Sequence, residues 1–153
     1  MAVALHEKAG ELSLALEWGL VGLDYIIRWA DEKILEGEDV SGELCDLSLA
    51  TDAKSALTAL NELAQGSAFW PSAARVLRRI AEIEDLSPRS AATLAKRVYF
   101  LGMRADAPEA YQNLMHHWDH IDLAINGTLS TPEQATKEFI QDVSAFVDRQ
   151  RNG

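Results

Sequence analysis

The stretch "NGTLSTPEQ" (residues 126–134) carries the signals for the end of one helix and the start of another. Gly127 is an end signal, because glycine readily adopts the left-handed conformation that closes many helices. Thr131 can cap a new helix, Pro132 suits its first position, and Gln134 can reach back to the cap. The stretch therefore predicts two helices joined by a short connection, which makes neighbouring helices antiparallel.

The same start and stop signals recur along the chain. "DLSPRS" offers Ser87 as a cap before Pro88, and "DAPEA" offers Asp106 as a cap with Glu109 three residues on. Ser41 is the expected cap of "GELCDLSLA". The signals predict helices over residues 23–35, 42–50, 52–65, 72–84, 88–103, 107–126 and 132–150.

The segment "ELSLALEW" (residues 11–18) fits two periods. Its apolar residues alternate as in a strand, but leucine, alanine and glutamate favour helix, and no other segment offers a strand partner. We therefore predict helix. The expected fold is all-α, with six to eight helices in antiparallel, bundle-like packing, and residues 1–153 forming a single helical domain.

Composition bounds the class of protein. The chain has 153 residues, of which 48% are hydrophobic and 25% charged, as in ordinary globular domains. No apolar run is long enough to span a bilayer, and the N-terminus lacks the features of a signal peptide. Cys45 is the only cysteine, which excludes an internal disulfide. We expect a cytoplasmic protein without a cofactor.

The net charge of −10 is unevenly distributed along the chain. Residues 1–65 carry thirteen acidic and four basic side chains, whereas residues 66–104 carry seven basic and three acidic ones. An acidic surface repels nucleic-acid phosphates and anionic lipids, and it attracts basic proteins. The sequence therefore predicts a protein partner, basic in character, and no binding to nucleic acid or membrane.

Three of the four histidines lie in "MHHWDHIDLA" (residues 115–124). On a helical wheel centred on Trp118, the apolar stripe contains Tyr111, Leu114, Ile121 and Ile125. His116 and His120 then lie on the solvent side, four residues apart, and His117 lies at the flank. The pair His116 and His120 is a weak candidate for metal binding, because a catalytic zinc site usually has three protein ligands. We favour a solvated polar face and assign no catalytic residue.

Two carboxylates lie within or beside apolar stripes. Asp122 falls inside the stripe centred on Trp118, and Asp31 lies at the edge of the stripe of residues 23–34. A buried carboxylate needs a hydrogen bond or an opposite charge. We therefore interpret Asp31 and Asp122 as buried structural carboxylates.

The helix over residues 23–35 has two apolar sides. Leu23, Ile27, Ala30 and Ile34 form one stripe, and two aromatic residues lie roughly opposite. Either the helix is packed on both sides, or the aromatic residues are exposed anchors with a charged rim, as in protein-binding hot spots. The residues of this candidate partner-binding surface are Tyr25, Trp29, Glu32, Glu36, Glu38 and Asp39.

Three stretches carry a resemblance: "EWGLVGLDYIIRWADEKI", "LCDLSLA" and "IDLAINGTL", about a third of the chain. They resemble small all-helical bacterial proteins of poorly characterised families, some of which are thought to be immunity proteins of polymorphic or contact-dependent toxin systems. The resemblance implies a cytoplasmic helical protein that binds and blocks another protein. It transfers no functional residue to this chain.

Three hypotheses follow. The first is a protein-binding module, most concretely an immunity-type inhibitor of a basic partner. The alternatives are a metal- or acid/base-dependent enzyme that uses the His116–Asp122 helix, and a structural homo-oligomer. We expect binding rather than catalysis.

Overall fold

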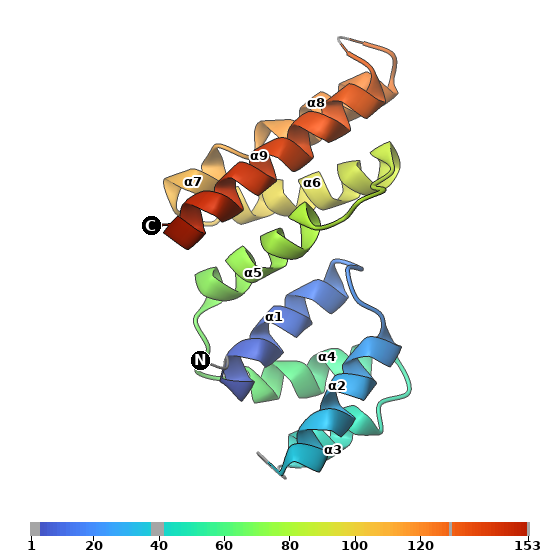
Figure 1. The fold of residues 1–153 in the computed structure, drawn as a ribbon, viewed down its shortest axis with the longest axis vertical. Helices are drawn as coiled ribbons and strands as arrows, with labels where there is room; N and C mark the ends of the chain where they lie inside the picture. The colour runs from blue at the N-terminus through green and yellow to red at the C-terminus, as the bar shows by residue number, and fades with distance from the viewer. Residues whose placement is uncertain (1–3, 38–41, 129, 153) are drawn as a thin grey trace. The chain divides into compact units, whose positions relative to one another are not determined.

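The computed structural model describes residues 4–37, 42–128 and 130–152 (Figure 1). The helices are α1 Leu5–Glu17, α2 Leu23–Glu36, α3 Gly42–Ser48, α4 Ala53–Leu63, α5 Phe69–Ala81, α6 Pro88–Gly102, α7 Glu109–Gln112, α8 His116–Ile125 and α9 Pro132–Asn152. The described ranges contain turns and short loops between helices, and no strand. The prediction of an all-α fold is therefore confirmed, including a helix for "ELSLALEW", which lies in α1 and its C-cap.

The contacts divide the chain into two compact units, residues 1–76 and 77–153, with the boundary inside α5. The expectation of a single domain stays a prediction. Within the part of the chain that the structure describes, no helix is both long and apolar enough to cross a membrane.

The first unit packs α1 and α3 against α4, and α2 against α3. Its core consists of apolar side chains from all four helices, including Leu12, Ile26, Leu44 and Leu60, which are fully buried. Leu12 is buried while its neighbours Leu14 and Leu16 in α1 are only half-buried, as expected for one face of a helix.

The second unit packs α6 against α7, α8 and α9, and α8 against α9. Its core includes the fully buried side chains of Val98, Ile121, Phe139 and Phe146. The ring of Tyr111 in α7 meets Phe146 edge-on, with 4.8 Å between the ring centroids. Aromatic rings of α7 and α9 therefore pack together in this core.

Local capping chemistry explains where the helices begin and end. Asp52, Ser87 and Thr131 each accept, through a side-chain oxygen, a hydrogen bond from the backbone N–H three residues on. Gly37 and Gly127 follow helix ends and have φ angles of 70° and 87°. These residues confirm the predicted boundaries at those positions. The predicted cap Ser41 lies outside the described residues.

The prediction of one continuous helix over residues 107–126 is wrong. A turn at residues 113–115 separates α7 from α8, and Asp106 does not cap either helix but lies 3.8 Å from the guanidinium of Arg104. Met115 packs so closely on Gly102 of α6 that a Cβ at Gly102 would lie 2.4 Å from Met115 Cγ. The turn, which places Met115 beside Gly102, changes which face of α8 is buried.

Candidate functional site

Helix α8 buries a different face from the one predicted. Its buried residues are His117, Ile121 and Ala124, whereas Trp118 is only half-buried. The centre of the buried stripe is thus about 100° away from Trp118. His117, which the wheel placed at the flank, is 1% exposed.

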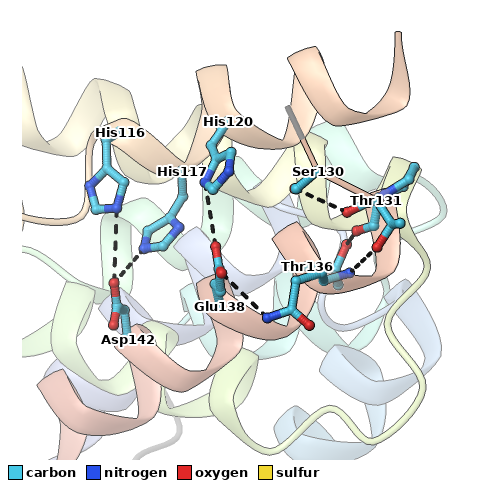
Figure 2. A network of polar contacts seen from close by, with 10 residues as sticks. His116, His117, His120, Ser130, Thr131, Thr136, Glu138 and Asp142 are labelled. Atoms are coloured by element: carbon cyan, nitrogen blue, oxygen red, sulfur yellow. Dashed lines mark hydrogen bonds and ion pairs between the residues drawn. The ribbon is translucent and has the colours of Figure 1, made fainter. Parts of the chain in front are cut away.

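Helices α8 and α9 form an antiparallel pair that joins histidines to carboxylates (Figure 2). His117 Nε2 lies 2.7 Å from Asp142 Oδ2, and His116 Nε2 lies 4.0 Å from the same oxygen. One turn along, His120 Nδ1 lies 3.5 Å from Glu138 Oε2. His116 thus faces Asp142, and His120, four residues later, faces Glu138, four residues earlier. Such opposite steps are expected for two antiparallel helices.

Asp142 and Glu138 were missing from the sequence-based candidates. A signal for them was available: Glu138 and Asp142 repeat the four-residue spacing of His116 and His120 on the other side of a short connection. Folding the chain back at that connection pairs residue 116 with 142 and residue 120 with 138. The candidate site therefore spans two helices rather than one.

The hydrogen bond to Asp142 fixes the tautomer of His117. A carboxylate accepts, so Nε2–H of His117 donates to Asp142 Oδ2. Within the described chain, the buried Nδ1 atom of His117 has no hydrogen-bond partner. Burial lowers the pKa of His117; the hydrogen bond and charge of Asp142 oppose this, and the nearby His116 and His120 add to it. At pH 7 and above, His117 is therefore a buried neutral imidazole in the folded protein.

This shift predicts that the folded protein loses stability as the pH falls below about 6.5, the ordinary pKa of an unfolded histidine. In that window the unfolded chain binds more protons at His117 than the folded chain does, because the pKa of His117 is lower in the folded protein. Thermal unfolding between pH 7.5 and 5.0, with chelator present, measures the effect. The His117→Phe variant should show a weaker pH dependence than both wild type and His120→Ala. An unchanged dependence in His117→Phe would contradict this assignment.

The structure groups the histidines differently from the prediction. His116, His117 and Asp142 each offer one ligand atom, and these atoms lie within 4.8 Å of one another. The His116 and His117 rings are 4.0 Å apart between centroids, inclined by 37°. The predicted metal candidates were His116 and His120, but His120 instead faces Glu138. The cluster that the structure brings together is thus two imidazoles and one carboxylate.

The interpretation of Asp31 and Asp122 as buried carboxylates is wrong. Both residues are exposed. The buried stripe of α8, formed by His117, Ile121 and Ala124, is rotated away from the predicted stripe centred on Trp118. Asp122 therefore lies about 140° from the centre of the buried stripe, on the exposed side of the helix. Asp31 accepts a hydrogen bond from the Ser48 hydroxyl of α3, so it has a partner without being buried.

Trp29 is not an exposed anchor. It is only 8% exposed and belongs to the core of the first unit, beside Ile26 and Ala30. The buried arc of α2 is therefore rotated by roughly 80° toward Trp29 from the predicted stripe. Tyr25 does remain at the surface, with 42% of its area exposed.

The exposed residues of α2 form one continuous surface, which we call the α2 outer face. On the helical wheel they occupy an arc of roughly 140°. Its members are Asp24, Tyr25, Arg28, Asp31, Glu32, Leu35 and Glu36. Two further predicted partner-binding residues, Glu38 and Asp39, lie outside the described residues. Of the predicted surface, the structure thus keeps Tyr25, Glu32 and Glu36 together.

Cys45 is half-buried in α3.

Comparison with protein-family models, with curated proteins and with solved structures gives no match to this chain. The resemblance to immunity proteins stays a prediction.

Proposed function

We propose that this chain is a protein-binding module, most concretely an immunity-type inhibitor that masks a basic partner protein. The α2 outer face is the observation that carries the proposal. It places exposed apolar side chains among carboxylates on one side of a single helix. An exposed helix face that combines apolar and charged side chains has the composition of a protein-binding surface.

The apolar part of this face consists of Tyr25 and Leu35, near the two ends of α2. Leu35 is 87% exposed, and Tyr25 is an exposed aromatic residue of the type enriched in binding hot spots. The hydrogen bond between Ser48 and Asp31 holds the end of α3 beside α2, and the next residue, Leu49, is exposed as well. A partner that covered these side chains would remove their apolar surface from water, which favours association.

The charged part of the face indicates the sign of the charge expected on the partner. It contains four carboxylates, from Asp24, Asp31, Glu32 and Glu36, against the single guanidinium of Arg28. Opposite charges on a partner would steer the encounter and raise the association rate, and this attraction is weakened by salt. A basic protein is the partner that such a surface suits best.

The test is a charge reversal on this face, Glu32→Lys with Glu36→Lys. Both residues are exposed, and the ion pair of Glu36 with Lys33, 3.0 Å long, lies at the surface, so folding should be retained. We expect the variant to lose a basic partner that the wild-type protein retains from an extract of the native cells. Once the partner is purified, its affinity should fall by about tenfold or more, mainly at low salt.

The matched control is Glu84→Lys with Asp148→Lys. It makes the same change in net charge at two exposed residues that do not belong to α2. It should keep the partner if the α2 outer face binds it. If both variants retained the partner equally, this placement of the surface would be refuted. If both variants lost the partner equally, net charge alone would explain the loss. The extract should be tested at low and at moderate salt. A folded wild-type protein that retains no basic protein in either condition would refute the proposed function.

A further inference from the structure

We propose that His116, His117 and Asp142 bind one divalent transition-metal ion of the zinc class. The proposal concerns the second unit and is independent of protein binding by the α2 outer face. It rests on the placement of three ligand-type side chains from α8 and α9 around one point (Figure 2).

The distances between the ligand atoms suit a small ion. A tetrahedral zinc ion with bonds of 2.0–2.1 Å holds its ligand atoms roughly 3.3–3.5 Å apart. Asp142 Oδ2 lies 2.7 Å from His117 Nε2 and 4.0 Å from His116 Nε2, distances that lie on either side of this value. The side chains of His116 and Asp142 are 59% and 52% exposed, so they can adjust around the fixed ring of His117. Completing the site therefore requires rotation of these two side chains while the ring of His117 stays in place.

The ligand set selects the kind of ion. Two imidazoles and one carboxylate suit Zn²⁺ and its neighbours in the first transition row, whereas Mg²⁺ and Ca²⁺ prefer oxygen ligands alone. The exposure of His116 and Asp142 leaves room for water to supply the remaining ligand. The arrangement therefore resembles an open site with three protein ligands rather than a closed structural site.

The surroundings of His117 limit the affinity of the site for the metal ion. When Nε2 binds the ion, the proton of the neutral ring must move to Nδ1, which is buried and has no acceptor within the described chain. Metal-binding histidines usually donate this second N–H to a carbonyl or carboxylate, and loss of that partner weakens binding by about ten- to a hundredfold. We therefore expect a weaker site than one with its outer hydrogen bonds complete.

The pair His120 and Glu138 provides an internal control. His120 is on the same helix as His116, four residues on, and its Nδ1 lies 3.5 Å from a carboxylate oxygen of Glu138. It is not part of the cluster whose ligand atoms lie within 4.8 Å of one another. Removing His120 thus tests whether metal binding needs only histidines of this helix in general or the three named ligands in particular.

The experiment titrates Zn²⁺ into the full chain, free of any affinity tag and treated with chelator, at pH 7.5. Calorimetry should show one saturable site per chain, and Zn²⁺ should raise the thermal unfolding temperature reversibly. His116→Ala and Asp142→Asn should each weaken binding by at least about tenfold, the effect found even for loss of an outer-shell partner. His120→Ala should bind Zn²⁺ as wild type does, and Mg²⁺ should not bind at the same concentrations.

The tested variants change exposed or half-buried residues, so each should stay folded, which circular dichroism checks. Absence of saturable Zn²⁺ binding by the folded wild-type chain would overturn the proposal. It would also fail if His120→Ala weakened binding as much as His116→Ala while Asp142→Asn did not. That outcome would assign the ion to the exposed pair His116 and His120 instead.

Discussion

Replacing Trp29 by alanine should lower the free energy of unfolding of the first unit by about 3–5 kcal/mol, the range found for buried tryptophan. Trp29 is only 8% exposed and packs with Ile26, Ala30 and Leu44 in the core of that unit. Its removal leaves a cavity that the surrounding helices can fill only in part. Denaturant unfolding of wild type and variant measures the difference.

The matched control is Tyr25→Ala, four residues earlier on the same helix. Tyr25 is 42% exposed, so its replacement should cost about 1 kcal/mol or less. If the two variants lost equal stability, the assignment of Trp29 to the core would be wrong. The same pair also separates two roles: Tyr25→Ala should weaken partner binding in a folded protein, whereas Trp29→Ala should act through folding.

Replacing Phe139 by alanine should cost the second unit about 3–5 kcal/mol. Phe139 is fully buried on α9, and its ring centroid lies 5.5 Å from that of His117. The cavity would also expose the imidazole of His117 to water. Because burial is the main cause of the lowered pKa of His117, the stability of this variant should depend less on pH than that of the wild-type protein.

Phe100→Ala is the control for this second prediction. Phe100 is 53% exposed and makes edge-on contact with Tyr99, 5.4 Å between centroids. Its replacement should cost about 0.5–1.5 kcal/mol and leave the pH dependence unchanged. A loss of stability as large as that of Phe139→Ala would contradict the distinction between a buried and an exposed ring.

The sequence predicts the helix boundaries well where local chemistry determines them. Ser87 and Thr131 cap their helices through their own side chains, and Gly37 ends α2 through its own backbone freedom. Each of these effects involves residues within one turn of the boundary. They can therefore be read from the sequence without knowledge of the rest of the fold.

The orientation of α8 could not be predicted in the same way. It depends on the turn that puts Met115 against Gly102, and this contact involves a residue of another helix. A helical wheel drawn as though residues 107–126 formed one helix ignores that turn. The wheel therefore combines residues of α7 and α8 whose angular positions are unrelated. The errors at His117 and Asp122 share this single cause.

The error on α2 has a different origin. Both sides of the helix carry large apolar residues, so periodicity alone does not decide which side faces the core. Tryptophan and tyrosine fit either a core or an interface, since each combines a large apolar ring with one polar group. The contacts with α3 and α4 decide in favour of Trp29, and these contacts are not local.

The antiparallel pairing of α8 and α9 also has a consequence for folding kinetics. His117 and Asp142 are only 25 residues apart in the sequence, and the two helices are joined by a short connection. Closing a loop of that size costs little conformational entropy, and contacts between near neighbours in sequence form rapidly. The histidine–carboxylate contacts should therefore form as soon as this helical hairpin does, early on the folding pathway of the second unit.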